Sequence, residues 1–551
     1  MGRETDPDPI LALDKRIEET TAELIQLKRS RNSLLAVMRP PPETLGHIFR
    51  LSATPAAAEG HFAGLRKDSY NFLLVCHHWS EVARHTPELW SFWGNSLEVW
   101  KRQYPHSGTF PLDLVLDGEE HRAGLFDGAL PDVLREQAAR DAIRKVHLRG
   151  HDIQLLTTIV STLTPEDSAT RESSIESIVL DGLNPPNFDP HLRIVDVSDF
   201  FSRHRFPKLQ NLSLTGHLNI SAWAWACLKS HTAALTDLSL SLNSPFSILT
   251  RSQILSLLAS NPNIRSLKLV LQGTDHDNRG GSKFRVPLYH LEELCLVGEV
   301  HHVFPILHEV ELPERVDRMK MSFRGSSADE IREAIGPHIR EYLRRDPRFE
   351  GRLGVCISII LNAISLRVGV IGVGDHGPDR PPQRDPPYAT FSVTPRGARL
   401  EERERLCIYV LSQLPQESIV YLETNLSAAT TKEMVVAMSN LEALYLINPV
   451  VFYGFLLPYP DRLNPHAKLL PSLRRLCLQD AKLDFRNPDW SHLVHYVTRQ
   501  TSGNHAFSLN IYGGDNIPHR LVEQMKGLVE EFTLGPSPGM DRLSHGREEL
   551  L

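Results

Sequence analysis

The residues that could support chemistry in this chain are few, and the most suggestive of them form a glycine motif. GVGDHG at 372–377 satisfies the G-x-G-x-x-G pattern that binds dinucleotides. That chemistry needs a helix directly after the glycines, because the helix N-terminus holds the pyrophosphate. The next residues are PDRPPQRDPP, in which the prolines prevent a helix. We therefore predict a loop here, and we expect no cofactor.

Histidines and cysteines could ligate a metal, but their spacing does not favour it. The 26 histidines are densest in HLRGH at 147–151 and at His301-His302, and neither place carries an H-E-x-x-H pattern. No CxxC pair occurs among the six cysteines, which are Cys76, Cys227, Cys295, Cys356, Cys407 and Cys477. Isolated cysteines inside apolar runs are typical of buried, reduced thiols in an intracellular protein. We expect neither a metal site nor a disulfide.

Motifs of nucleophilic or nucleotide-dependent enzymes are also missing from the sequence. It contains neither a G-x-S-x-G elbow nor a P-loop. We therefore predict a protein that is not an enzyme. An enzyme whose site assembles in space from residues within 322–440 is the alternative.

The composition indicates a folded protein whose partners are not nucleic acids. The 551 residues are 41% hydrophobic with a net charge of −7, and the pI lies near 6.4. The first residues, MGRETDPDPI, are too polar for a secretory signal. The most apolar window, 353–366, is too short and too β-branched to span a membrane, so it predicts a buried strand. We expect an intracellular protein without a membrane partner, in the cytoplasm, the nucleus or both.

The elements that must position any functional residues begin with a helix in 1–37. A heptad a/d seam runs through Ile10, Leu13, Ile17, Thr20, Leu24, Leu27, Arg31 and Leu34, with Arg31 as its break. This predicts an amphipathic helix with coiled-coil character. It either packs on its own chain, which we expect, or associates with another copy. The prolines of RPPPE at 39–43 end it.

Residues 38–95 predict a small all-α bundle. Leu45, Ile48 and Phe49 recur at i, i+3, i+4, and FLLVCHHWSEVARHTPELWSFW at 72–93 carries a second stripe of helical spacing. Within it, Thr86 and Pro87 predict the N-cap and first residue of a further short helix. A few dozen residues cannot build a sizeable core. Either the rest of the chain or a partner should cover the stripe.

From about residue 140 a motif of the form L-x-x-L-x-L recurs. It occurs at 143–148, 175–180, 209–214, 235–240, 264–269, 291–296, 316–321, 441–446 and 473–478. Such units stack strand beside strand, which predicts an irregular α/β repeat solenoid with an open strand face. Between the leucine-type positions, side chains should point outward. The outward candidates for contact with a target protein are Ser213, Ser239, Lys268, Cys295, Lys320, Tyr445 and Cys477.

These patterns predict the following organisation of the chain. After the helix (1–37) and the bundle (38–95), we expect a connector strand and linker (96–140), repeats (141–325), an irregular insertion (326–440) with a Pro-rich linker (377–387), further repeats (441–530) and a disordered tail (531–551).

The segment SAWAWACL predicts a helix between two repeats. Both Trp223 and Trp225 are expected in the core of this helix, and a partner contact is the alternative.

Taken together, PPETLGHIF, LLVCHHWSEVA and TPELW resemble the F-box of fungal proteins, whose usual form is LPPEILxxIF, then VCRxWR, then TPxLW. Pro40 stands where leucine is usual, and His77-His78 replaces a pair that is usually basic. The matching positions are Pro41, Pro42, Glu43, Leu45, Ile48, Phe49, Val75, Cys76, Trp79, Val82, Ala83, Pro87, Leu89 and Trp90.

This resemblance implies a partner and a function. F-box domains dock onto a Skp-type adaptor of a cullin–RING ubiquitin ligase, while a C-terminal region, here leucine-rich-repeat-like, captures a protein substrate. The alternative is a repeat scaffold without adaptor docking. The implied adaptor contacts are Pro41, Pro42, Glu43, Leu45, Ile48, Phe49, Val75, Cys76 and Trp79.

Overall fold

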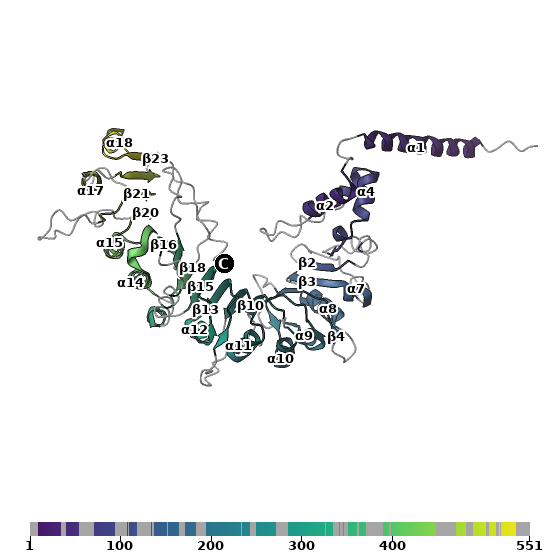
Figure 1. The fold of residues 1–551 in the computed structure, drawn as a ribbon, viewed down its shortest axis with the longest axis horizontal. Coiled ribbons are helices and arrows are strands. Elements are labelled where there is room, and N and C mark those ends of the chain that lie inside the picture. Colours follow the sequence, from purple (N-terminus) through teal and green to yellow (C-terminus); the bar gives the residue numbers. More distant parts are fainter. Residues whose placement is uncertain are drawn as a thin grey trace, which may run out of the picture. The chain divides into compact units, whose positions relative to one another are not determined.

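Short strands and helices alternate along most of the chain in the computed structural model, which is a mixed α/β protein (Figure 1). Two units can be distinguished: unit 1 comprises residues 1–235 and 243–247, and unit 2 comprises residues 236–242 and 248–551. The structure describes residues 9–34, 40–53, 71–93, 107, 110–117, 134, 137–150, 153–164, 171–182, 194–232, 234–242, 250–271, 285–325, 327–333, 341, 345, 351–360, 363–370, 389–395, 398–447, 470–480, 489–502, 506–513, 517 and 519–535.

Helix α1 (Pro9–Ser33) is the N-terminal helix that the heptad pattern predicts. Every residue from 10 to 31 is exposed, including the apolar side chains of the seam. The expectation that this helix packs on its own chain is therefore wrong. Its apolar seam faces solvent.

A small helical bundle follows in unit 1. It consists of α2 (Pro42–Ala53), the helical residues 71–75, α4 (His77–Arg84) and the 3₁₀ helix η3 (Pro87–Trp90). Its buried core contains residues from all three named helices: Leu45, Phe49, Val82, Ala83, Leu89 and Trp90. Pro42 is the first residue of α2 and Pro87 the first of η3, the helical position that tolerates a missing N–H.

The sheet of unit 1 is parallel. Its order is β1 (Phe92–Trp93), β2 (Leu112–Asp117), β3 (Ile143–Gly150), β5 (Ser177–Gly182) and β8 (Asn211–Gly216). Helices α7 (Gln137–Ala142), α8 (Ile153–Leu163), α9 (Ser198–Arg203) and α10 (Ala222–His231) belong to the same unit. Two-residue strands form small parallel pairs beside it: β4 (Arg171–Glu172) with β7 (His204–Arg205), and β6 (Val195–Asp196) with β9 (Leu218–Asn219).

Unit 2 contains a longer sheet, which is parallel except for one strand that runs antiparallel to both of its neighbours. Strands β10 (Asp237–Leu242), β11 (Ser266–Leu271), β13 (Glu293–Gly298) and β15 (Arg318–Arg324) pair in sequence order. Next come β18 (Ala389–Thr394), β17 (Ala363–Val370) and β16 (Leu353–Ile360), with β17 antiparallel to both neighbours. Parallel pairing then resumes through β19 (Ile419–Thr424), β20 (Ala443–Ile447), β21 (Arg475–Gln479), β22 (Ser508–Tyr512) and β23 (Glu531–Gly535).

The segment 326–440, which lacks a leucine period, thus contributes four strands to the sheet of unit 2. The apolar window at 353–366 supplies β16 and the start of β17, so it is strand as expected. Strand β23 occupies 531–535, within the segment expected to be a disordered tail. The GVGDHG motif and the Pro-rich linker at 377–387 lie outside the described residues.

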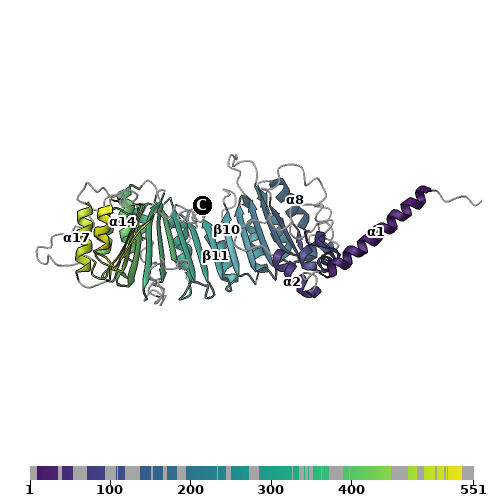
Figure 2. The ribbon, with the colours of Figure 1, turned by 90° about the horizontal axis from the view of Figure 1, so that it is seen from above.

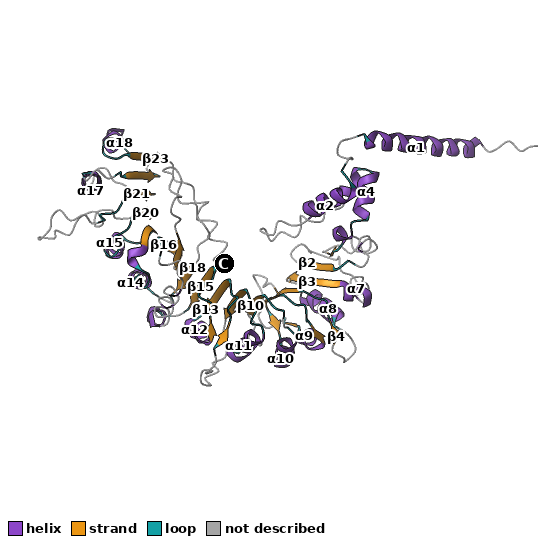
Figure 3. Ribbon diagram, in the orientation of Figure 1, coloured by secondary structure: helices purple, strands orange, loops and turns teal. Residues whose placement is uncertain are grey.

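Helices of unit 2 line one face of its sheet, as Figure 3 shows in purple against the orange strands, and Figure 2 shows the strands side by side. These helices are α11 (Arg251–Ser260), α12 (Val300–Glu309), α14 (Leu400–Leu411), α15 (Ala428–Val435), α17 (Asp489–Thr501) and α18 (His519–Lys526). A short parallel pair, β12 (Val286–Pro287) with β14 (Val310–Glu311), accompanies them.

Burial alternates strictly along several strands, β8 and β10 among them. Leucines fill the buried positions, and the residues between them are partly exposed, as a sheet covered on one face requires. None of the described helices is long and apolar enough to cross a lipid bilayer.

Candidate protein-interaction sites

The bundle closes its core with two of the expected adaptor contacts. Leu45 is 1% exposed and Phe49 is fully buried. The Phe49 ring stacks on Phe72 with centroids 4.3 Å apart, and its centroid lies 5.1 Å from that of Trp79. Leu45 and Phe49 therefore hold α2 in place, and their side chains are not available to a second protein.

Apolar side chains of the same bundle remain in solvent. Ile48 is 42% exposed, and Leu51, one helical turn further along α2, is more exposed still. Leu74 and Val75 are exposed on the helical residues that carry Phe72, with Leu74 at 81%. Pro41, Pro42 and Glu43 are also exposed where α2 begins. We call Ile48, Leu51, Leu74 and Val75 the exposed apolar set; two of them, Ile48 and Val75, are sequence-predicted contacts.

Cys76 and Trp79 have structural roles within the bundle. Cys76 has extended backbone angles and is the N-cap of α4, where its sulfur accepts from the Trp79 backbone N–H at 3.4 Å. Trp79 is partly buried, and its indole Nε1 is buried without a hydrogen-bond partner in the described structure. Thr86 is the N-cap residue of η3 as predicted, but its side chain does not cap that helix: its hydroxyl donates to the carbonyl of Val82 at 2.8 Å, at the end of α4.

The outward positions of unit 1 form one row across its strands. Ser213 in β8 is paired with Val179 in β5, which is paired with His147 in β3. His147 lies 2.9 Å from the hydroxyl of Ser177 through Nε2. Burial, and next the charge of Lys145, lower the pKa of His147 to about 4, with Asp113 acting in the opposite direction. His147 is thus a neutral part of the strand face.

In unit 2, four of the predicted contact residues stand side by side. Ser239 is in register with Lys268, Lys268 with Cys295, and Cys295 with Lys320. Because residues in register on neighbouring parallel strands point to the same face, the four side chains share one surface. Tyr445 and Cys477 are likewise in register on β20 and β21.

The two groups belong to a single row that we call the strand row. Between Lys320 and Tyr445 the register passes through Thr390, Arg367, Cys356 and Glu423, and beyond Cys477 it passes through Asn510 and Thr533. Sequence reasoning missed these residues because their strands lack the leucine motif. The apolar–polar alternation in 353–368 was the signal that could have found Cys356 and Arg367.

Charge is distributed unevenly along the strand row. Lys268, Lys320 and Arg367 give its first half three cations on five successive strands of the sheet. Cys295 lies between the two lysines; burial raises the pKa of its thiol, and Lys320 and Lys268 oppose that rise. The row therefore offers a basic stretch suited to acidic side chains.

The second half of the strand row is more buried and contains one tyrosine, Tyr445. The Tyr445 ring lies 4.9 Å from that of Tyr421, a residue of β19 outside the row, whose hydroxyl donates to Glu423 at 2.9 Å. Tyr445 is partly buried, and its pKa is raised mainly by that burial. Cys477 is only 3% exposed, and burial raises its pKa to about 12. Cys477 thus packs within the sheet, and Tyr445 is the better contact candidate.

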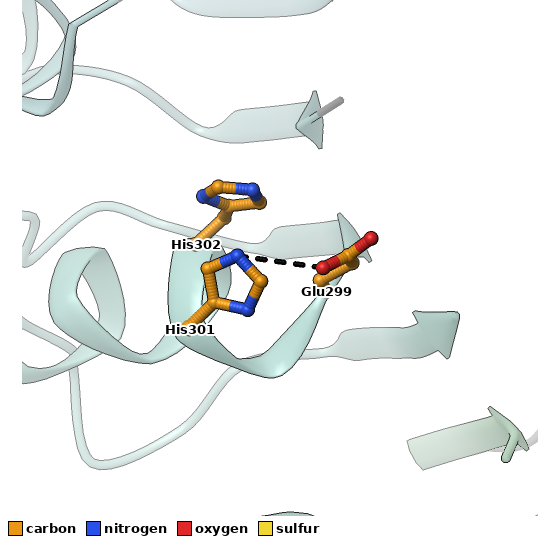
Figure 4. Close-up of side chains that lie close together, drawn as sticks. All are labelled: Glu299, His301 and His302. Atoms are coloured by element: carbon orange, nitrogen blue, oxygen red, sulfur yellow. Dashed lines mark ion pairs between the residues drawn. The ribbon is translucent and has the colours of Figure 1, made fainter. Parts of the chain in front are cut away.

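A third group of side chains gathers at the start of α12 (Figure 4). His301 Nε2 and Glu299 Oε2 are 3.4 Å apart, and the His301 and His302 rings have centroids 3.9 Å apart. Their possible ligand atoms all lie within 4.8 Å of one another, and imidazole with carboxylate suits a transition metal such as zinc. The ion pair between Glu299 and His301 accounts for this approach without a metal, so we assign the group no metal role.

A surface hollow of about 550 Å³ lies where β16, β19, β20 and β21 begin. Its lining includes Arg352 and Glu442, which form an ion pair with each other. No nucleophile paired with a base occurs among its lining residues. The hollow therefore gives the enzyme alternative no reacting group.

No known protein-family model matches this chain, and no curated protein matches it. The similarity of 38–95 to the F-box therefore rests on the residues of that segment. The bundle and the strand row are the two surfaces from which a function can be inferred.

Proposed function

We propose that this protein is a non-catalytic substrate receptor of a cullin–RING ubiquitin ligase. Its bundle binds a Skp-type adaptor, and the strand face of its repeats binds a target protein. The observation that carries the proposal is the exposed apolar set on a bundle whose own core is already closed by Leu45, Phe49 and Trp90. Four large apolar side chains on two packed helices are a typical partner site.

This set can contribute substantially to pairing. Fully burying one such side chain contributes roughly 1.5–3 kcal/mol, and because the four are only partly exposed, with Ile48 at 42% and Val75 at 52%, together they contribute about 4–7 kcal/mol. Part of this offsets the loss of translational and rotational freedom on association. The exposed Pro41, Pro42 and Glu43 at the start of α2 can add polar and packing contacts at its rim.

We further propose that each unit is part of an irregular, leucine-rich-repeat-like solenoid. Its support is that most of the longer strands pair with the next longer strand along the chain, with helices between many of them, while β15 to β19 depart from this order. Repeat architectures of this kind leave an open strand face on which partners bind. The basic first half of the strand row favours an acidic segment of the target.

Direct binding to a purified Skp-type adaptor tests the first proposal. Wild-type protein should bind the adaptor. The variant with both Ile48→Asp and Leu74→Asp should not, because it places two carboxylates in the exposed apolar set, where charged groups would have to be buried in the complex. Val436→Asp is the matched control: Val436 is an exposed apolar residue of unit 2, and its change should leave binding intact. Adaptor binding measured by calorimetry provides the comparison.

Three outcomes separate the alternatives. Loss of binding only in the double variant supports the receptor. No binding by the wild type leaves the repeat scaffold without adaptor docking. Equal binding by the wild type and the double variant would show that the adaptor binds a surface other than the exposed apolar set.

Target capture is tested separately. Proximity labelling in cells with the proteasome inhibited should mark acidic targets with wild-type protein, and Lys268→Glu with Lys320→Glu should lose them through charge repulsion. A labelled set unchanged by that double variant contradicts the assignment of the basic stretch.

A further inference from the structure

Helix α1 presents the largest group of unburied apolar side chains in the described structure. Ile17 is 59% exposed and Leu27 63%, and the other apolar seam residues, Ile10, Leu13, Leu24 and Leu34, are exposed to a similar degree. A 25-residue helix is roughly 38 Å long, so the seam is a continuous stripe rather than an isolated contact. In proteins most of the stability of an amphipathic helix comes from packing of its apolar face, and in the described structure the apolar face of α1 is exposed.

We propose that α1 pairs with α1 of a second copy of this chain in a parallel, two-stranded coiled coil. The apolar period is 3.5 residues, the spacing at which two helices can wrap around each other with one seam facing inward. Ile10, Ile17 and Leu24 occupy a positions, and Leu13, Leu27 and Leu34, the last directly after the helix, occupy d positions. The β-branched residues at two of these a positions, with leucine at d, favour two parallel strands.

The charges beside the seam suit the same arrangement. In a parallel pair, Glu23 at a g position faces Lys28 at the following e position of the other copy, and this attraction occurs twice. In an antiparallel pair with the same core, Glu23 faces Glu23 of the other copy. The ion pair of Lys15 with Glu19, at 3.9 Å, lies on the outer side of the helix and does not compete.

The two polar residues of the seam are compatible with pairing. The Thr20 hydroxyl donates to the Arg16 carbonyl of its own helix at 2.8 Å, so Thr20 can enter the seam without an unsatisfied donor. Arg31 sits at an a position near the end of α1, where its long side chain can reach water. A polar residue at an a position, as Arg31 is, lowers stability while restricting register, so the dimer should be reversible.

Mass in solution tests this inference with the full-length protein. Analytical ultracentrifugation of the 62.2 kDa chain should give a species of 2 × 62.2, about 124 kDa, that dissociates on dilution. Leu24→Asp with Leu27→Asp replaces two seam residues and should give only the monomer. Leu11→Asp with Ile25→Asp changes two exposed apolar residues of α1 that lie off the seam, and it should remain dimeric.

Orientation has its own readout. Ile10→Cys should form an intermolecular disulfide on mild oxidation, because Ile10 faces its counterpart only in a parallel pair, and the unsubstituted chain treated alike controls for its own six cysteines. A monomeric wild type, or equal dissociation of the seam and off-seam variants, overturns the coiled coil. Dimers that Ile10→Cys does not cross-link overturn the parallel arrangement. None of these results depends on adaptor binding, so this inference and the proposed function can fail separately.

Discussion

The indole Nε1 of Trp90 donates a hydrogen bond of 2.7 Å to the backbone carbonyl of Ala83, which joins η3 to the last turn of α4. Both residues are buried in the bundle core. The tryptophan of the TPELW segment therefore fixes the angle between two helices as well as filling space. Removing only its hydrogen bond should loosen α4 without emptying the core.

Trp90→Phe should reduce the local stability of the bundle by about 1–3 kcal/mol, because a buried hydrogen bond and part of a buried ring are lost. Hydrogen–deuterium exchange of peptides from 77–90 measures the effect. Trp223→Phe is the control, since Trp223 is 70% exposed. Equal exchange in wild type and Trp90→Phe would show that the hydrogen bond has no stabilising role.

Leu45 and Ile48 are predicted to respond oppositely to mutation although three residues separate them. Leu45→Ala opens a cavity in the bundle core and should cost about 2–5 kcal/mol, whereas Ile48→Ala should change folding stability by less than about 0.5 kcal/mol. Limited proteolysis of the bundle distinguishes the two. Comparable cleavage of both variants contradicts the assignment of Leu45 to the core and of Ile48 to the surface.

Cys76 should be replaceable by serine with a gain in stability. A hydroxyl is a better N-cap acceptor than a thiol, so Cys76→Ser should stabilise α4 by a few tenths to about 1 kcal/mol, while Cys76→Ala removes the cap and should destabilise it by a similar amount. Exchange rates of the amides near Trp79 report both changes. The same direction of change in both variants rules out a capping role for the side chain.

Much of the strand content could be predicted from the sequence because one short motif marks it. Each L-x-x-L-x-L copy contains a strand, from β3 at 143–150 to β21 at 475–479. Leucine at alternate positions needs one covered face, and the helices between the strands supply the cover. The outward residues occupy the same place in each copy of the motif, and the strands pair in register. Ser239, Lys268, Cys295 and Lys320 therefore lie in one row.

The L-x-x-L-x-L motif could not predict the strands whose buried positions are filled mainly by other apolar residues. Strands β16, β17 and β18 bury mostly valine, isoleucine, alanine and phenylalanine, with leucine only at Leu353 and Leu366, and β17 runs antiparallel to both of its neighbours. Trp223 and Trp225 cannot both be core residues, because residues two apart on a helix do not share a face; Trp225 alone is buried. The seam of α1 is exposed because no described element covers it. A local sequence pattern predicts the helix and its apolar seam but not whether another element packs on that seam.

Cys295 provides a chemical probe of the strand row. Burial raises the pKa of its thiol, and Lys320 and Lys268 lower it. Lys320→Met removes one of the opposing cations, so the thiol pKa should rise further, and the thiolate fraction at pH 8 and the labelling rate should both fall. Iodoacetamide labelling of the Cys295 peptide, followed by mass spectrometry, measures this. Lys208→Met, a change at an exposed residue of unit 1, should leave the rate unaltered.

His147 makes the sheet of unit 1 sensitive to acid. Its pKa is about 4 in the folded protein against 6.5 when unfolded, because burial and Lys145 disfavour the charged ring. Below pH 6.5 the unfolded chain binds the proton more readily than the folded one does, so stability falls as the pH drops through 6.5 and levels off only below about pH 4. The pKa difference of 2.5 units, 6.5 minus 4, corresponds to a loss of folding stability on the order of 3 kcal/mol.

His147→Gln tests this prediction, because glutamine can form a hydrogen bond to Ser177 but does not titrate. Hydrogen–deuterium exchange of the β3 and β5 amides should therefore depend less on pH between 6.5 and 4 in this variant than in the wild type. Identical pH profiles for the two proteins would mean that folding does not lower the pKa of His147, despite its partly buried position beside Lys145.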